Sequence, residues 1–348
     1  MNNFYIEFRD PLFSVIVFFL IVFLVSFFSY WWGRYKQKEN SKSLDRFLKQ
    51  FSTLPTEGEL KSLIQNSTMS EKSWLLLASS YTKNGDYEKS IEIYSEIIKN
   101  NITSNYKETM FLLGKTYFKA GFLQRARDIF LKILQQSPRT PQALKYLLLV
   151  YEYMKDYKSA LEVLEPLQIL GIDVKKEQDY LNTLLILNNN SLKQDEKTKQ
   201  LVDIYEQNHT MTYPIFEYLF RHNPKLAWKH LDTSKSELLL DILWQLPKKD
   251  LDFDIISTNG YLRELYTAKG EINLAKSSDI FEFNILINLD KKVNATLNFE
   301  YICDSCKQVS PFVFNRCSYC HEIDSARIEI GLTKDYYKDF NEESNSFL

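Results

Sequence analysis

The stretch Lys107–Thr140 reads KETMFLLGKTYFKAGFLQRARDIFLKILQQSPRT. Its apolar residues recur every three or four positions in two blocks, as they do on the inner faces of two helices. Gly121 separates the blocks, and glycine commonly ends a helix because it adopts the left-handed conformation without strain. Pro138 interrupts the chain after the second block. The stretch therefore predicts one helical hairpin.

Two neighbouring stretches repeat this pattern, one starting at Glu71 and the other at Pro141. The three starts are 36 and then 34 residues apart, close to the 34-residue period of tetratricopeptide repeats (TPRs). Small residues recur in register where the two helices of each unit would cross. They are Ala78 and Gly114 on first helices, and Ser90, Ala126 and Ala160 on second helices. A generic amphipathic hairpin would lack them, so the pattern favours three TPR units over residues 71–171.

Charge and composition restrict the class of protein. The formal net charge is only −2, which argues against a nucleic-acid binder because such proteins need a basic surface. Gly and Pro number nine each, which favours helices over a sheet-rich fold with many tight turns. No catalytic motif stands out, so the sequence does not indicate an enzyme.

Leu12–Trp32 form an uncharged segment of 21 residues, which matches the ~20 residues needed to cross a bilayer. Tyr30, Trp31 and Trp32 end it like an interfacial aromatic belt. A cleaved signal peptide is the alternative, but the preceding residues are not basic and no small-residue cleavage site follows. Lys and Arg are concentrated after the segment, so the positive-inside rule places the C-terminal part in the cytoplasm.

All four cysteines lie near the C-terminal end, as Cys303, Cys306, Cys317 and Cys320. They form two C-x-x-C pairs separated by ten residues, a spacing typical of a tetrahedral metal site with four thiolate ligands. Zinc and iron both suit four thiolates, and the sequence does not decide between them. Two disulfides or two redox dithiols are the alternatives, and a cytoplasmic location disfavours disulfides. His321 would be a bystander, because four thiolates complete the ligand set.

These features divide the chain into six expected regions. They are an anchor (1–33), a juxtamembrane degenerate helical pair (34–70), three TPR units (71–171), degenerate helical repeats (172–295), a metal-binding knuckle (296–332) and a flexible tail (333–348). The expected fold is mostly α, a TPR-type α-solenoid with one N-terminal transmembrane helix. A small rubredoxin-like or zinc-ribbon knuckle follows the solenoid.

A partner-binding surface is expected on the repeats. The first helix of each TPR unit lines a concave face of the solenoid. Basic and aromatic side chains at its outward positions suit an acidic or extended protein segment, and a merely solvated helix face is the alternative. The candidate residues are Lys72, Phe111, Lys115, Phe118, Lys119, Lys145 and Tyr153.

The combination of anchor, repeats and knuckle resembles the lipopolysaccharide assembly protein B family. YWWGRYKQ, after the anchor, is similar to that family's juxtamembrane segment. LLGKTYFKAGFLQRARDIFLKIL and ALKYLLLVYEYMKDYKSALEVLEPL are similar to its central repeats, and YICDSCKQVSPFVFNRCSYC matches its knuckle in cysteine spacing. The resemblance covers the anchor, residues 71–171 and residues 300–330 well, and residues 172–295 poorly.

The knuckle departs from the family pattern at three positions. Lys307 stands in place of a glycine, Asn315 in place of an aromatic residue and Ser318 in place of a proline. The four cysteines are retained, so the departures concern the hydrogen bonds around the sulfur atoms.

The resemblance implies a non-enzymatic adaptor at the bacterial inner membrane. Such proteins work with the membrane AAA protease FtsH to adjust degradation of the deacetylase that commits precursors to lipid A, and so set lipopolysaccharide output. In the family the knuckle packs against the TPR array, is needed for function and holds its metal through the four cysteines. A scaffold for another inner-membrane complex and a rubredoxin-type electron carrier are the alternatives.

Overall fold

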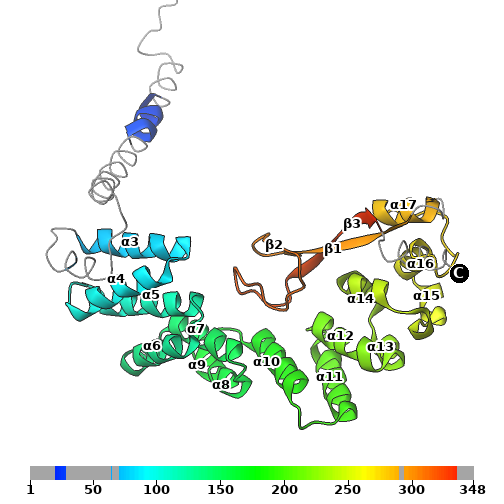
Figure 1. Cartoon of the computed structure of the whole chain (residues 1–348), viewed down its shortest axis with the longest axis horizontal. Coiled ribbons are helices and arrows are strands. Elements are labelled where there is room, and N and C mark those ends of the chain that lie inside the picture. Colours follow the sequence, from blue (N-terminus) through cyan, green and yellow to red (C-terminus); the bar gives the residue numbers. More distant parts are fainter. Residues whose placement is uncertain (1–19, 29–63, 65–69, 290–293, 335–348) are drawn as a thin grey trace, which may run out of the picture. The chain divides into compact units, whose positions relative to one another are not determined.

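Helices dominate the computed structural model of the chain (Figure 1). The residues that the structure describes are 20–28, 64, 70–289 and 294–334. Two compact units make up the chain, Met1–Val150 and Tyr151–Leu348. In the described ranges, strands occur only in the second unit, after its last helix.

The first unit consists of helical hairpins. Its helices are α3 (Glu71–Asn84), α4 (Tyr87–Lys99), α5 (Tyr106–Lys119), α6 (Leu123–Gln136) and the first part of α7 (Pro141–Tyr153). Glycines in the left-handed conformation stand between the helices of the first two hairpins, with φ of 87° at Gly85 and 80° at Gly121. The turn positions expected from these glycines are therefore confirmed.

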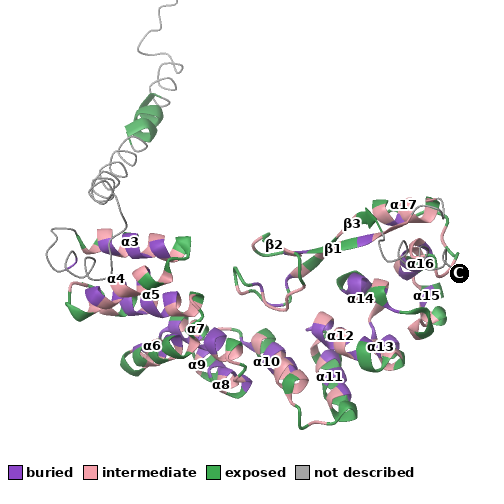
Figure 2. Cartoon of the chain, viewed as in Figure 1, coloured by how far each residue is buried: buried purple, intermediate pink, exposed green. Residues whose placement is uncertain are grey.

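Small side chains let the two helices of a hairpin pack closely. Ala78, Ser90 and Ala126 have no exposed surface, and the Ser90 hydroxyl donates to the Ala78 carbonyl at 2.8 Å. A Cβ atom at Gly114 would lie 2.8 Å from Cε1 of Phe130, well inside the usual carbon–carbon contact distance. Only glycine fits there without displacing the ring. Figure 2 shows buried, intermediate and exposed positions along the helices of these hairpins.

The second unit continues with helices that are mostly shorter. They are α8 (Tyr157–Glu162), α9 (Leu164–Ile169), α10 (Lys175–Asn188), α11 (Gln194–Asn208), α12 (Thr212–His222), α13 (Pro224–His230), α14 (Leu240–Gln245), α15 (Phe253–Thr258), α16 (Gly260–Ala268), α17 (Phe281–Asn288) and the 3-10 helices η1 (Thr233–Leu239) and η2 (Lys248–Asp250). Val163 separates α8 from α9, because Pro166 lacks the N–H that would continue the helix. The helical patterns expected after the third repeat are thus present, in uneven lengths.

A three-stranded antiparallel sheet follows α17. The central strand β1 (Ala295–Cys303) pairs with β2 (Val309–Ser310) on one side and with β3 (Ala326–Lys334) on the other. Cys303 is paired with Ala326, so residues 304–325 connect β1 to β3 at one end of the pair, and β2 within this connection runs back alongside β1. All four cysteines fall at this end, and the sheet therefore carries the knuckle.

The anchor predicted over Leu12–Trp32 falls largely outside the described residues. Within it, residues 20–28 are helical with exposed side chains. Across the part of the chain that the structure describes, no helix combines the length and apolar character needed to cross a membrane. The predicted juxtamembrane pair and tail also lie mostly outside these ranges. Ile64 is the described residue of that pair, and it is buried in the core formed with α3 and α4.

Candidate metal centre

Four sulfur atoms meet beyond the end of the β1–β3 hairpin. The Sγ atoms of Cys303, Cys306, Cys317 and Cys320 all lie within 4.8 Å of one another. The Sγ–Sγ distance is 3.6 Å for Cys303–Cys320 and for Cys306–Cys317. Zinc–sulfur bonds of about 2.3 Å in a tetrahedron imply sulfur–sulfur distances of about 3.8 Å. The thiols singled out in the sequence therefore form a cluster compatible with a tetrahedral metal site.

The first C-x-x-C turn places two of these sulfurs through a pair of backbone hydrogen bonds. The Cys303 N–H donates to the Gln308 carbonyl at 3.0 Å, and the Lys307 N–H donates to the Cys303 carbonyl at 2.8 Å. Lys307 has a φ of 61°, the left-handed conformation that a glycine adopts without strain. The glycine that the resemblance leads one to expect here is thus replaced by a lysine with the same backbone conformation.

The second turn repeats this geometry. The Cys317 N–H donates to the Glu322 carbonyl at 2.9 Å, and the His321 N–H donates to the Cys317 carbonyl at 2.9 Å. His321 has a φ of 64° and occupies the position that Lys307 holds in the first turn. His321 therefore shapes the turn through its backbone, while the cluster of ligand atoms consists of the four cysteines.

We expect Lys307→Gly to stabilise the knuckle by about 1 kcal/mol, because a side chain in the left-handed region costs ~1–2 kcal/mol. Its ion pair with Asp304 is exposed and 3.5 Å long, so losing it costs little. Thermal unfolding of the metal-loaded protein should show a higher Tm. As a control, Gln308→Gly should lower the Tm, since Gln308 has no positive φ to relieve. A Tm for Lys307→Gly at or below that of the parent would contradict the expectation.

Hydrogen bonds around the cluster favour a thiolate at Cys303. Burial raises the pKa of Cys303, but the Ser325 hydroxyl at 3.3 Å and the backbone N–H groups of Ser305 and Cys306 outweigh burial and lower the pKa to about 6. Burial of the Cys320 sulfur among the other thiols raises the pKa of Cys320 to about 12, although the residue as a whole is exposed. A cation between the sulfurs would let all four ionise, so this donor set fits a metal ion.

Arg316, directly before Cys317, joins the knuckle to the repeat helices. Its side chain is 5% exposed, and its Nε lies 2.7 Å from Oε2 of Glu152 in α7, an ion-pair contact rather than an aligned hydrogen bond. Its Nη2 donates to Oε2 of Glu177 in α10, also at 2.7 Å. Its Nη1 donates to the His321 carbonyl, inside the second turn, at 2.8 Å. One guanidinium thus connects the cysteine turn with two helices.

Tyr180 of α10 completes this docking site. Its ring centroid lies 5.0 Å from Cζ of Arg316, and its hydroxyl donates to Oε1 of Glu152 at 2.9 Å. Burial raises the pKa of Glu152, and the charge of Arg316 opposes that rise. For Arg316 burial acts to lower the pKa, but the Glu177 hydrogen bond and the two carboxylates outweigh it and raise the pKa. The buried charges at this contact are therefore paired, which is the condition for burying them.

A second buried contact holds the sheet against the helices of the same unit. Asp241 of α14 is 3% exposed. Its Oδ2 accepts hydrogen bonds from the Tyr213 hydroxyl at 2.6 Å and from the Tyr301 hydroxyl of β1 at 2.5 Å. Nearby, Nε1 of Trp244 donates to the hydroxyl of Thr296 at 3.2 Å. The sheet is thus fixed to α12 and α14 at one place while Arg316 fixes the knuckle at another.

Three of the candidate partner-binding residues gather around Tyr146 of α7 in the first unit. The Tyr146 ring centroid lies 5.4 Å from that of Phe111 and 5.8 Å from that of Phe118. Nζ of Lys115 lies 5.7 Å from the same ring. The aromatic side chains are half-buried, so they pack α5 against α7 as well as facing outward. Tyr146 was missed in the sequence, where it reads as one more apolar position.

The other candidate partner-binding residues are exposed. Lys72, Lys119 and Lys145 belong to the first unit, and Tyr153, which is 49% exposed, belongs to the second. Their role in binding stays a prediction.

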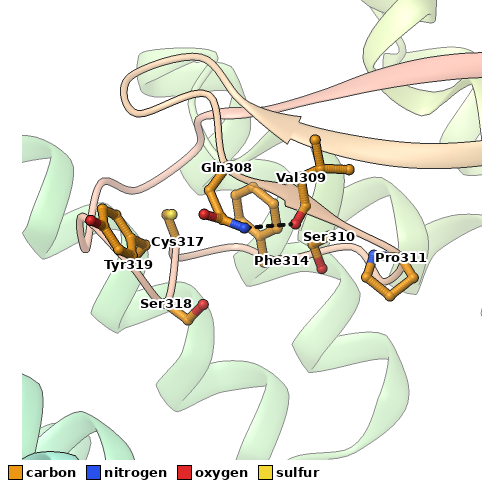
Figure 3. A pocket seen from close by; sticks show the side chains of 8 residues that line it. All are labelled: Gln308, Val309, Ser310, Pro311, Phe314, Cys317, Ser318 and Tyr319. Carbon is orange, nitrogen blue, oxygen red and sulfur yellow. Dashed lines mark hydrogen bonds between the residues drawn. The ribbon is translucent and has the colours of Figure 1, made fainter. Parts of the chain in front are cut away.

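A shallow pocket of about 360 Å³ adjoins the metal centre (Figure 3). Val309, Pro311 and Phe314 supply apolar surface, and Cys317 is the metal-ligand candidate in its lining. The lining contains no Asp, Glu, Lys, Arg or His side chain, and its ionisable residues are Cys317 and Tyr319.

A tetratricopeptide repeat model matches residues 71–101, which contain α3 and α4. The chain thus contains a tetratricopeptide repeat. Over 116 residues this repeat protein is 28% identical to photosystem I assembly protein Ycf3 of Prochlorococcus marinus, covering 32% of this chain and 66% of that protein. Over 117 residues it is 24% identical to lipopolysaccharide assembly protein B of Escherichia coli, covering 33% and 30% respectively. Each match spans less than two thirds of the relative's own length.

A solved tetratricopeptide repeat protein from Parabacteroides merdae is 15% identical to this repeat protein, with a TM-score of 0.38. The match covers 62% of this chain and 83% of that one. Tetratricopeptide repeats commonly present protein-binding surfaces, and this repeat protein has weak similarity to lipopolysaccharide assembly protein B.

Proposed function

We propose that the chain is an adaptor anchored in the bacterial inner membrane, whose TPR helices bind protein segments in the cytoplasm and whose metal-loaded knuckle caps the helices. The buried contact of Arg316 with Glu152 and Glu177 carries this proposal. It fixes the knuckle to α7 and α10 through buried charges, and leaving one of these charges buried without its partner would cost about 3–5 kcal/mol. A knuckle fixed to the helices in this way favours a role in a binding surface over a role as a freely diffusing electron carrier.

The metal has a structural part in this proposal. Cys303, Cys306, Cys317 and Cys320 would hold one zinc or iron ion, and a bound ion supplies a cross-link between the two turns. A closed set of four protein ligands leaves no position for a reactive water. The short knuckle has too small a core to hold its own shape, so the ion would replace that core.

Membrane attachment rests on the uncharged segment Leu12–Trp32 and on the basic residues that follow it. Attachment would concentrate the repeats at the cytoplasmic face of the membrane, where a membrane-bound partner also lies. Lys115, Phe111 and Phe118 around Tyr146 would then offer a cationic and aromatic surface to an acidic or extended segment of that partner.

The biological role follows from the similarity to lipopolysaccharide assembly protein B. The adaptor would bring the lipid A deacetylase to the membrane AAA protease FtsH and thereby limit lipopolysaccharide synthesis. The predicted anchor, the repeats and the spacing of the four cysteines support this role, and the 24% identity extends over one third of the chain.

Depletion of the protein tests this role directly. We expect the amount of deacetylase and of lipopolysaccharide to rise several-fold, because the deacetylase would no longer be degraded. Affinity capture from cross-linked membranes should recover both the protease and the deacetylase. Metal analysis of the same sample should find one ion per chain. Unchanged amounts of both molecules after depletion would refute the role, and capture of a different complex would assign the scaffold to that complex.

A further inference from the structure

One edge of the sheet is unpaired along β3. The Cys303 N–H bonds toward β2, and neighbouring residues of an antiparallel strand point their backbone groups to opposite sides. The odd-numbered residues of β3 therefore bond to β1. The even-numbered residues Ala326, Ile328, Ile330 and Leu332 direct their N–H and C=O groups away from the sheet. Within the described chain, none of these outward groups has a hydrogen-bond partner.

Among the described residues, no strand pairs with this edge of the sheet. β3 has nine residues, longer than the usual strand of about five or six. Arg327, Glu329 and Leu332 are exposed along it. An exposed edge of this length is a template for pairing with another strand. The side chains that would face each other across the new strand pair indicate which strand fits this edge.

The charges of β3 complement those of a second, antiparallel β3. When Ile328 faces Ile328 of a second copy, Ala326 faces Ile330 in a hydrogen-bonded pair. Arg327 then faces Glu329 of the second copy, and Glu329 faces its Arg327. Opposite charges that face each other across antiparallel strands are stabilising, and like charges are destabilising. A register centred on Glu329 would place the two glutamates opposite each other and is disfavoured.

The existing sheet adds to this complementarity. Glu300 of β1 is directly opposite Glu329 of β3, and Arg327 of the same chain lies 2.8 Å from Glu329 and 3.5 Å from Asp304, so acidic side chains outnumber the arginine here. An arginine from a second copy would extend that row with the opposite charge. On the other face, Ile328 continues a row that begins with the buried Tyr301. On both faces of the sheet, the side chains of β3 are therefore compatible with those of a second β3.

We propose that β3 pairs with β3 of a second copy of this chain in the register centred on Ile328. The two sheets would join into one sheet of six strands, related by a two-fold axis through Ile328. Three hydrogen-bonded residue pairs and two Arg327–Glu329 pairs would hold the copies together. This dimer does not depend on the proposed role in lipopolysaccharide synthesis.

Charge reversal in separate copies tests both the partner and the register. Two differently tagged full-length, metal-loaded chains are mixed in detergent, and the fraction of one that co-purifies with the other is measured. R327E alone and E329R alone should each weaken association about tenfold, because each places two like-charge pairs in its own dimer. A mixture of R327E with E329R should associate like the parent, because every pair is again of opposite charge.

The control variant is R139E, which makes the same change of charge at an exposed position of the first unit and should leave association unchanged. Ile328→Pro removes an N–H that points away from β1, so it should abolish association while the metal content is kept. Parent chains that do not associate would overturn the proposal. So would R327E and E329R chains that associate no better when mixed than when alone.

Discussion

Replacing Cys317 with serine should release the metal and unfold the knuckle while leaving the repeat helices folded. A structural zinc site contributes ~10–16 kcal/mol of apparent binding energy at neutral pH, and a hydroxyl does not replace a thiolate ligand. Cys317 is also the candidate ligand next to Arg316, so loss of its turn would remove the docking contact as well. We expect bound metal to fall at least tenfold and hydrogen-exchange protection to be lost over residues 296–332.

The helices α3 to α6 provide the internal control for this variant. Their core includes Trp74, Ile93 and Phe130, which are buried within the first unit, so their protection should persist. Ser318→Ala, at the neighbouring exposed position, should keep the metal and the protection of the knuckle. A Cys317→Ser chain that still binds one ion and keeps adaptor activity would show that the cluster is not the structural centre.

Replacing Arg316 with methionine should detach the knuckle from the repeats. Methionine fills part of the space but leaves the Glu152 carboxylate buried without its cation. Removal of one partner from a buried ion pair typically costs about 3–5 kcal/mol. The four cysteines are unchanged, so we expect the metal to stay bound while amide hydrogen exchange over residues 316–322 becomes faster. A stability loss below about 1 kcal/mol would mean that Arg316 does not hold the knuckle.

Two further variants test whether the stability lost in R316M comes from the unpaired Glu152 carboxylate or from general disruption of the interface. Lys176→Met removes an exposed contact of the same interface, a 3.2 Å ion pair with Glu322, and should cost less than about 1 kcal/mol. The double variant R316M/E152Q also removes the stranded carboxylate charge, so it should regain part of the stability lost in R316M. A double variant less stable than R316M would contradict the assignment of the cost to Glu152.

The helical hairpins could be predicted from the sequence because their determinants are close together in the chain. Gly85 and Gly121 mark turns through their own backbone preference. Gly114 and Ala126 mark a helix crossing through their size alone. Each signal acts within one hairpin, and the 34-residue period repeats it. After residue 172 the helices have uneven lengths, so the period fades there and their boundaries could not be read in the same way.

The metal centre likewise has some features that could be predicted from the sequence and others that could not. The four thiols were identifiable because a C-x-x-C turn needs only its own residues to bring two sulfurs together. Lys307 was an apparent departure from the expected glycine, and the structure shows that it keeps the left-handed backbone all the same. The docking residues had no comparable signal, since Glu152 and Glu177 look like ordinary polar positions of two helices.

The sequence by itself determined the repeat hairpins and the set of four thiols, because both depend on short-range spacing. Only the tertiary structure decided which residues fix the knuckle to the helices. Arg316 meets Glu177 across 139 residues of chain, and a contact between two single side chains leaves no periodic pattern in either segment. The open edge of β3 is likewise a property of the sheet, since the side of the strand that faces β1 becomes known only from its register.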